Sequence, residues 1–597
     1  MKKCIILSIA ILFSGTFFCQ KQTETSTETT ISVKETPIMY HRARIYYNGP
    51  KGILLLANQG LAVDHGHHKF GVYIESDFSE NEIQKAKMLG MKVEIQIEDV
   101  KQFYVNQNKG INKSTPLKNN SGCSGPSAVI YPVPTNYNHG SMGGFLTLTE
   151  LYQELDDMAA LYPNLISVRA PVSTFLTHEN RPLYWVRMSD NPNSDEAEPE
   201  VLYTAIHHAR EPEAMQQLVY YMWYMLENYA TNTEVQGILD NTELYFIPMV
   251  NPDGYQHNVD NDPNGGGMHR KNKRNIGTSN PGVDNNRNYD YINGAGNSIW
   301  GTTGVSSNPN NDTYPGTGPF TEPENQAIKW FVENHNIKLA LNNHTSGDLL
   351  LYPYGYGNNQ LTSDNSTYVE ISGMMVAENG YNNMISAGLY PAAGDSDDFM
   401  YGETSTHDKI FAFTPEIGGT GFWPAINEID PIAEGMVYLN LTAAHLVTNY
   451  AQTSDLTAAI IPNLTGSFYY DIQRLGLEDP ANFSVSIIPI SSNILSVGTP
   501  NTHNAMALLQ QDNDSISYAL DPTITSGDAL TYVISVDNGQ YLSNDTVTKI
   551  YGQSQIVFTE AGNNLNNWSS SASWNTTTST FYSPSSSITD SPGGNYS

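Results

Sequence analysis

The sequence predicts an α/β protein with a central mixed, largely parallel sheet flanked by helices, preceded by a small α+β domain and followed by β-sandwich modules. Two observations favour this class. Between residues 141 and 452, short apolar runs typical of buried strands alternate with segments of helical spacing. Beyond residue 455 the helical segments stop, and apolar stretches separated by Asn, Asp, Ser and Gly predict a β-rich region.

The composition suits a chain of several globular domains with many turns. Of the 597 residues, 39% are hydrophobic, 47 are Gly and 32 are Pro, so the chain can bury a sizeable core. The formal net charge of -32 should repel nucleic acid and anionic membranes, so we expect neither as a partner. We interpret this acidity as a source of solubility, with adaptation to a salty medium as the alternative.

Residues 1–19 have the layout of a secretory signal peptide: two lysines, an apolar run, then small and polar residues. The run is too short for a permanent membrane span, so we expect a secreted or cell-surface protein, with a periplasmic location as the alternative. Cys19 raises the question of a lipoprotein, but Phe18 stands where a small residue would precede a lipidated cysteine. With Cys4 and Cys19 removed, Cys123 has no partner for an internal disulfide.

Residues 20–36 are rich in Thr, Glu and Ser and predict a flexible leader, whereas residues 37–108 predict the small α+β domain. The stretch from Asp64 to His68 contains three histidines, which could ligate a metal, but a solvated turn is the preferred interpretation. The expected strands are residues 43–47, 71–74 and 92–97, and the expected helix is residues 80–89.

Residues 109–140 predict a linker rich in Asn, Ser, Gly and Pro. Its lysines, Lys109, Lys113 and Lys118, would make it accessible to proteases.

The central domain, residues 141–452, contains strands and helices in alternation, which favours a largely parallel sheet. Ligand sites in such sheets lie beyond the carboxyl ends of the strands. The expected helices are residues 146–162 and 212–229, and the expected strands are residues 182–188, 201–206, 244–250, 337–344 and 411–416.

Four of these strands end in residues that could form a site. The run at 201–206 leads into His208, Arg210 and Glu211, the run at 244–250 ends in the turn at 251–254, and the two later strands end in His344 and Glu416. Because His208 and Glu211 are three residues apart, both can reach one ion, and zinc suits their nitrogen and oxygen donors. For that pair alone, a satisfied histidine beside a solvated glutamate is the alternative.

Guanidinium groups are concentrated in residues 268–274 and 282–290, which is unusual in so acidic a chain. An arginine beside an asparagine suits the binding of a carboxylate. Salt bridges on a solvated loop are the alternative.

Seven motifs in order across the central domain carry a resemblance to a known family. The chain resembles the zinc carboxypeptidases of the pancreatic carboxypeptidase A and B type and their secreted bacterial relatives. The motifs are H-A-R-E at 208–211, N-P-D-G at 251–254, M-H-R-K at 268–271, V-D-N-N-R-N at 283–288, N-H-T-S at 343–346, Y-P-Y-G-Y at 352–356 and F-T-P-E at 413–416.

The resemblance implies one catalytic Zn²⁺ ion held by His208, Glu211 and His344, with the fourth position left for water. It makes Asp284 the carboxylate that holds a zinc histidine in its tautomer. It also makes Glu416 the general base that activates the zinc-bound water.

The remaining implied roles concern the substrate. Arg270 would stabilise the oxyanion, and Asn286 with Arg287 would bind the free C-terminal carboxylate. Tyr390 would close over the terminal residue, and Arg210 would contact the substrate further from its end.

Specificity is expected to come from residues 389–401, which look more like the B-type segment. Asp397 stands where B-type enzymes place the carboxylate that receives a terminal Lys or Arg, so the resemblance implies a preference for basic C-terminal residues. Asp395 and Asp398 could be turn or structural groups. Thr345 and Ser346 depart from the family pattern, in which an aromatic residue follows the zinc histidine.

Family members are often made as zymogens, so the resemblance implies that residues 37–108 are an inhibitory propeptide released by an activating protease. A permanent accessory domain is the alternative. Further on, residues 455–550 predict a β-sandwich, and residues 551–597 look like the start of a jelly-roll-like module. About 45 residues cannot close such a module, so we expect the natural chain to continue past Ser597, with a disordered tail as the alternative.

The sequence thus predicts a secreted zinc metallocarboxypeptidase acting on peptides or proteins with a free C-terminus. Two alternatives remain: a peptidoglycan stem-peptide hydrolase of the same fold, and a catalytically inactive adhesin or binding protein.

Overall fold

The computed structural model describes residues 38–110, 131–357, 360–419, 421–553, 562–569, 574–579 and 586–589. The expected signal peptide, the leader, most of the linker and all three cysteines lie outside these residues. No helix among the described residues combines the length and apolar character needed to cross a membrane.

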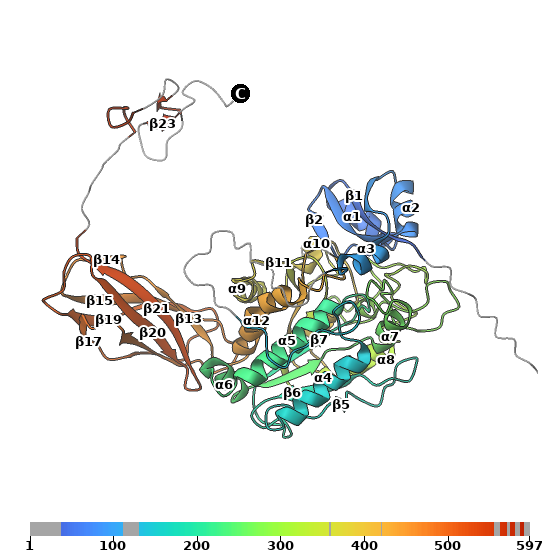
Figure 1. Cartoon of the computed structure of the whole chain (residues 1–597), viewed down its shortest axis with the longest axis horizontal. Coiled ribbons are helices and arrows are strands. Elements are labelled where there is room, and N and C mark those ends of the chain that lie inside the picture. The colour runs from blue at the N-terminus through green and yellow to red at the C-terminus, as the bar shows by residue number, and fades with distance from the viewer. Residues whose placement is uncertain are drawn as a thin grey trace, which may run out of the picture. The chain divides into compact units, whose positions relative to one another are not determined.

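The central domain contains an eight-stranded sheet in the order β11-β10-β12-β9-β7-β8-β6-β5. Figure 1 labels β5, β6, β7 and β11 of this sheet and the helices around it. Strands β12, β9, β7 and β8 run parallel, whereas β10 joins β12, and β6 joins β8, in antiparallel fashion. The predicted mixed α/β fold is therefore confirmed. The strands are β5 (Ala170–Pro171), β6 (Tyr184–Met188), β7 (Glu200–Ala205), β8 (Glu243–Ile247), β9 (Ile337–Asn343), β10 (Leu349–Tyr352), β11 (Asn382–Ile385) and β12 (Phe411–Glu416).

Helices cover both faces of this sheet, which explains why β7 is apolar throughout and does not alternate. Leu202 belongs to a buried cluster with residues of α8 and α11. The next residue, Tyr203, points to the other face, where its hydroxyl donates to the carbonyl of Asn440 in α12 at 2.8 Å. The helices are α4 (Leu148–Leu161), α5 (Pro212–Asn228), α6 (Thr233–Leu239), α7 (Pro252–Asn261), α8 (Pro323–Glu333), α9 (Asn365–Met375), α10 (Ser386–Leu389), α11 (Ser396–Gly402) and α12 (Ile429–Leu446), with a 3₁₀ turn at Asn285–Arg287.

The parallel strands bring their carboxyl ends to one edge of the sheet. His344 follows β9 and pairs with Glu416, the last residue of β12, through a parallel bridge. The chain leaves β7 through Ile206, whose φ of 59° is unusual for a β-branched residue and turns the backbone sharply before His208. Glu211 then precedes Pro212, which occupies the first turn of α5, where its missing N–H costs no hydrogen bond.

The N-P-D-G motif at 251–254 acts as a structural brace. Asn251 accepts a hydrogen bond from the amide of Gly254 at 3.0 Å and so caps α7. Its side-chain amide donates to the carbonyls of His207 at 3.3 Å and Arg270 at 3.4 Å. One residue thus ties the ends of two strands to the loop that carries Arg270. A Cβ at Gly254 would overlap the carbonyl oxygen of Lys271, so only glycine fits there.

The N-terminal domain is a four-stranded antiparallel sheet in the order β2-β3-β1-β4, in a βαββαβ arrangement. Sequence reasoning missed α1, which begins with Gly49 and Pro50; proline is well tolerated in a first helical turn. It also missed β2 and α3. The elements are β1 (Tyr40–Tyr46), α1 (Gly49–Asn58), β2 (His67–Lys69), β3 (Tyr73–Ser79), α2 (Glu80–Met88), β4 (Lys92–Ile97) and α3 (Val100–Gln107).

Two further sheets follow the central domain, in the orders β13-β15-β19-β17 and β14-β21-β20-β16-β18. Side chains from both sheets share one buried cluster that includes Phe468 and Tyr532. A short pair, β22 and β23, lies beyond them, and most of residues 551–597 falls outside the described residues. The strands are β13 (Ala451–Asp455), β14 (Ile460–Ile461), β15 (Thr465–Arg474), β16 (Phe483–Pro489), β17 (Ile494–Val497), β18 (Asn501–His503), β19 (Gln511–Leu520), β20 (Ala529–Asp537), β21 (Leu542–Tyr551), β22 (Asn575–Thr577) and β23 (Ser587–Thr589).

Replacing Gly254 with alanine should lower the melting temperature of the full chain, because the added Cβ overlaps backbone and overpacking costs about 1–3 kcal/mol. The matched control is Gly435→Ala in α12, where the residue is exposed and a Cβ meets open space. That change should leave the melting temperature unchanged or raise it slightly. Thermal unfolding followed by circular dichroism measures both, and equal melting temperatures for Gly254→Ala and wild type would contradict the brace.

Candidate active site

Three side chains converge on one point at the carboxyl edge of the sheet. Nδ1 of His208 lies 2.8 Å from one carboxylate oxygen of Glu211, and Nδ1 of His344 lies 2.8 Å from the other. The two Nδ1 atoms are 3.1 Å apart. All three side chains are buried, with 1% or less of their surface exposed. The two Nδ1 atoms and the two carboxylate oxygens of Glu211 can all act as hydrogen-bond acceptors. At these distances they need a proton or a cation between them.

The far nitrogen of one ring is already engaged. Nε2 of His208 lies 3.0 Å from Asp284, which leaves its Nδ1 lone pair directed at Glu211. Asp284 also accepts hydrogen bonds from Arg270 at 2.9 and 3.1 Å. Although burial works in the opposite direction, the charges of Arg270 and His208 hold the pKa of Asp284 well below its usual range. A permanently ionised carboxylate is well suited to fix the tautomer of a metal-binding histidine.

The donor set fits a zinc ion. Two nitrogen ligands on a tetrahedral zinc are about 3.3 Å apart, close to the separation of the two Nδ1 atoms. Two imidazoles and one carboxylate make up a common set for catalytic zinc, which keeps a fourth position open. His208, Glu211 and His344 would hold the ion, and Asp284 would orient one ligand.

Glu416 faces this cluster from the end of β12 and is 3% exposed. Burial, together with the nearby charges of Glu211 and Asp64, raises the pKa of Glu416 well above its usual range. A carboxyl group of raised pKa beside the candidate metal ligands has the properties of a general acid or base.

Two guanidinium groups flank the same point and share one carboxylate. Arg270 binds Asp64 at 2.6 Å, and Arg287 binds the same oxygen at 2.7 Å. Arg287 also donates to the hydroxyl of Tyr390 at 2.8 Å. Asp64 belongs to the N-terminal domain, so both guanidinium groups are paired with a carboxylate of that domain.

The remaining predicted substrate residues lie nearby. Asn286 lies with its amide nitrogen 3.3 Å from Nε2 of His344, and its side-chain oxygen accepts a hydrogen bond from the amide of Ser396 at 3.0 Å. Arg210 is buried, pairs with Asp312 at 3.0 Å and lies over the ring of Phe422 at 4.4 Å. Arg210 is therefore in the site region but engaged with other side chains.

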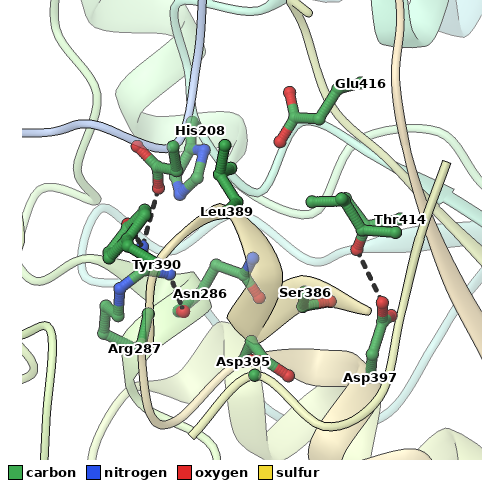
Figure 2. Close-up of a pocket in the computed structure, with 14 residues that line it drawn as sticks. His208, Asn286, Arg287, Ser386, Leu389, Tyr390, Asp395, Asp397, Thr414 and Glu416 are labelled. Carbon is green, nitrogen blue, oxygen red and sulfur yellow. Dashed lines mark hydrogen bonds and ion pairs between the residues drawn. The ribbon is translucent and has the colours of Figure 1, made fainter. Parts of the chain in front are cut away.

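A pocket opens beside the arginines and reaches Asp397 (Figure 2). Asp397 is 2% exposed and accepts hydrogen bonds from Thr414 and Asn342, both at 2.8 Å. Burial and the charge of Asp395 raise the pKa of Asp397 to about 8, although these two hydrogen bonds act against the shift. This raised pKa favours the neutral form of the Asp397 carboxyl at pH 7.

The two neighbouring aspartates have different partners. Asp398 accepts the backbone amides of Gly355 at 2.8 Å and Tyr356 at 3.0 Å, so it holds the Y-P-Y-G-Y loop in place. Asp395 caps α11 through the amide of Asp398 at 2.7 Å and also lines the pocket. These contacts favour a structural role for Asp395 and Asp398, which the sequence had left open.

The solvated-turn interpretation of the stretch from Asp64 to His68 is wrong for His65. The ring of His65 is 1% exposed and lies beside the metal-ligand cluster, with Nε2 3.1 Å from Glu211 and Nδ1 3.3 Å from Glu416. Asp64 and His65 were the site residues that sequence reasoning missed. The only signal was a dense run of histidines in a turn, which carries no information about a partner hundreds of residues away.

Comparisons with known proteins agree with this geometry. A family model described as "Zinc carboxypeptidase" matches residues 151–438. The chain is 28% identical over 316 residues to a zinc carboxypeptidase of Saccharothrix mutabilis subsp. capreolus, a match that covers 51% of this chain and 68% of the relative. It is 31% identical over 298 residues to carboxypeptidase A1 of Sus scrofa, covering 48% of this chain and 66% of that one.

Among solved structures, the carboxypeptidase A of Helicoverpa armigera matches with a TM-score of 0.52 and 20% identity, covering 69% of this chain and 98% of that one. Thrombin-activatable fibrinolysis inhibitor matches with a TM-score of 0.51 and 18% identity, covering 68% of this chain and 98% of that one. At these identities the likeness concerns the fold alone.

The substitution Glu211→Gln should abolish stoichiometric zinc binding, because it replaces the carboxylate that faces both histidines. The matched control is Glu213→Gln. Glu213 is buried two residues away, its oxygens have no hydrogen-bond partner among the described residues, and burial raises its pKa well above the usual range. Elemental analysis after dialysis should find one zinc per chain in wild type and Glu213→Gln. Equal zinc content in Glu211→Gln and wild type would contradict the assignment.

Proposed function

With residues 151–438 as a zinc carboxypeptidase domain, we propose that the chain is a secreted zinc metallocarboxypeptidase that hydrolyses the C-terminal peptide bond of peptides or proteins. One observation carries the proposal most strongly. Arg270 and Arg287 share the carboxylate of Asp64, and Arg287 lines one pocket with His208 and Glu416 beside the buried cluster of His208, Glu211 and His344. We call Arg270 and Arg287 the arginine clamp. Two guanidinium groups beside a hydrolytic metal suit a substrate that ends in a carboxylate.

The chemistry divides between the metal and three residues of the chain. Bound zinc would supply Lewis acidity for the carbonyl and for water. Glu416 takes a proton from the attacking water and returns it to the leaving amine, a role that its raised pKa favours. Arg270, held by Asp284, stabilises the negative charge that develops on the carbonyl oxygen.

The clamp explains why the enzyme would remove terminal residues. Arg287 binds the free terminal carboxylate with Asn286 beside it, and Tyr390 closes over the terminal residue with its hydroxyl already on Arg287. An internal peptide bond has no carboxylate to place there. Cleavage is therefore restricted to the last bond of the chain.

Preference for C-terminal Lys or Arg is the proposed specificity, with Asp397 as the group that receives the cation. Figure 2 shows Asp397 bonded to Thr414 on the side of the pocket opposite Arg287 and Tyr390. A terminal residue whose carboxylate lies on Arg287 would point its side chain toward Asp397. A cation there would favour the ionised form of a carboxyl that is otherwise buried and neutral.

We further propose that the N-terminal domain is an inhibitory propeptide. Its apolar core continues into the wall of the pocket, since Leu56 and Val63 share one buried cluster with Leu389 and Tyr390. Its Asp64 occupies the arginine clamp. The match to the Helicoverpa armigera structure also covers more of this chain than residues 141–452 contain. Cleavage in residues 109–140 by an activating protease would free the domain to leave.

Secretion is proposed from residues 1–19. The complete set of Glu416, both clamp arginines and three candidate ligands supports hydrolysis over the adhesin alternative. Peptidoglycan stem peptides also end in a carboxylate and remain the alternative substrate.

The full chain, before and after limited proteolysis, should be incubated with matched peptides ending in Arg, Phe or Glu and with a stem peptide. We expect C-terminal residues to be released after proteolysis and the release to stop with a chelator. Glu416→Gln should lower kcat by about 10³-fold while zinc content stays at one. Glu213→Gln is the control and should keep wild-type activity. Release that continues in Glu416→Gln, or with zinc removed, would refute the mechanism.

Asp397→Asn should lower kcat/KM for peptides ending in Arg by roughly 100-fold and leave peptides ending in Phe nearly unchanged. In wild type the cation needs ionised Asp397, whose pKa is raised to about 8. The ratio of kcat/KM for Arg over Phe peptides should therefore rise as pH passes through about 8 and level above that, where Asp397 is mostly ionised. Steady-state kinetics from pH 6 to 10 tests this. A flat ratio in wild type, or a preference unchanged in Asp397→Asn, would remove Asp397 from specificity.

A further inference from the structure

The loop between α1 and β2 carries an imidazole into the candidate metal centre. His65 is 1% exposed, and its ring meets the ring of His208 edge-on at 5.4 Å between centroids. Its ring also meets that of Phe422 edge-on at 5.2 Å. A histidine at the tip of a surface domain is ordinarily solvated, so this burial needs a reason.

The ring nitrogens of His65 face two carboxylates of the site. Nδ1 lies 3.3 Å from Glu416, which suits a proton on Nδ1 and a free lone pair on Nε2. Nε2 lies 3.1 Å from the oxygen of Glu211 that also faces Nδ1 of His208 at 2.8 Å. His65, His208 and Glu211 thus form a group whose ligand atoms all lie within 4.8 Å of one another.

The loop is fixed on both sides of His65. On one side Asp64 is held by Arg270 and Arg287. On the other, the amide of Gly66 donates to the carbonyl of Ser346 at 2.8 Å, two residues past His344. Gly66 has a φ of 91°, and a Cβ there would overlap the carbonyl of Glu75. The backbone is therefore shaped to hold the ring at this position.

We propose that His65 is the fourth ligand of the zinc ion while the N-terminal domain is in place, through its Nε2. This inference rests on the proposed function, since it requires zinc on His208, Glu211 and His344. A three-ligand catalytic site keeps one position for water or substrate, and His65 fills that position. Asp64 and His65 then block the terminal-carboxylate site and the metal together.

Two other contacts of Nε2 compete with this assignment. Arg270 approaches the nitrogen closely and could donate a hydrogen bond to it, and Oδ1 of Asp64 lies 3.1 Å from it. In that case His65 would exclude water by its bulk and leave the metal with three protein ligands. The two roles differ in the number of imidazoles bound to the metal, which can be measured without any assay of activity.

X-ray absorption spectroscopy of the zinc-loaded, uncleaved full chain should show three imidazoles on the metal, falling to two after limited proteolysis and removal of the N-terminal domain. His65→Ala should show two in the uncleaved chain. The control is His67→Ala, because His67 is exposed on β2, and it should show three.

Transfer of zinc to a chelator gives a second readout. It should be at least roughly tenfold faster in His65→Ala than in wild type or His67→Ala. Two imidazoles in uncleaved wild type would overturn the proposal and assign Nε2 to Arg270 or Asp64, and equal transfer rates for His65→Ala and wild type would also count against it. The comparison of uncleaved with cleaved wild-type chain does not depend on the folding of any variant. If the cleaved chain still releases C-terminal residues with chelator sensitivity in either case, the proposed function stands and only the role of His65 fails.

Discussion

The site depends on the parallel register of β12, β9, β7 and β8. Parallel strands end at the same edge of a sheet, and here each of three strands leads directly into a residue of the cluster. The bridge between His344 and Glu416 places those two side chains next to each other through backbone hydrogen bonding alone. His208 needs a further device, the sharp turn at Ile206, which Asn251 holds from behind. In a sheet with another register, His208, His344 and Glu416 would not lie at one edge.

Burial of so many charges is the second constraint. Unpaired charges in a protein interior are costly, and the two arginines beside the metal-ligand residues are paired with carboxylates. Arg270 balances Asp284, and Asp64 balances both Arg270 and Arg287. The last balance comes from the N-terminal domain, so its departure would leave two guanidinium groups without Asp64. The same two guanidinium groups would then be free for a substrate carboxylate, so the proposed inhibition and the proposed substrate binding use the same residues.

The aspartates of α11 show how one short segment can serve fold and specificity together. Asp398 and Asp395 bind backbone amides and hold the pocket wall, while Asp397 turns into the pocket with side-chain partners. The two hydrogen bonds on Asp397 do not offset its burial, which raises the pKa of its carboxyl to about 8. Under the proposed specificity, a basic terminal residue would pair with the ionised form of this carboxyl.

The sequence by itself determined the α/β class, the candidate ligands and the central-sheet strands β6, β7, β8, β9 and β12, but not β5, β10 and β11. Strand-ending motifs such as H-A-R-E could be found because they keep their chemistry within a few neighbouring residues. It also indicated the small N-terminal domain, apart from α1, β2 and α3. Only the tertiary structure decided that His65 and Asp64 enter the site, since they meet Glu416 and Arg287 from 351 and 223 residues away. Local patterns carry no record of such distant pairing. The same holds for Asp397. Its role could not be told from those of Asp395 and Asp398 by sequence, because the three carboxylates differ only in the groups that the fold places next to them.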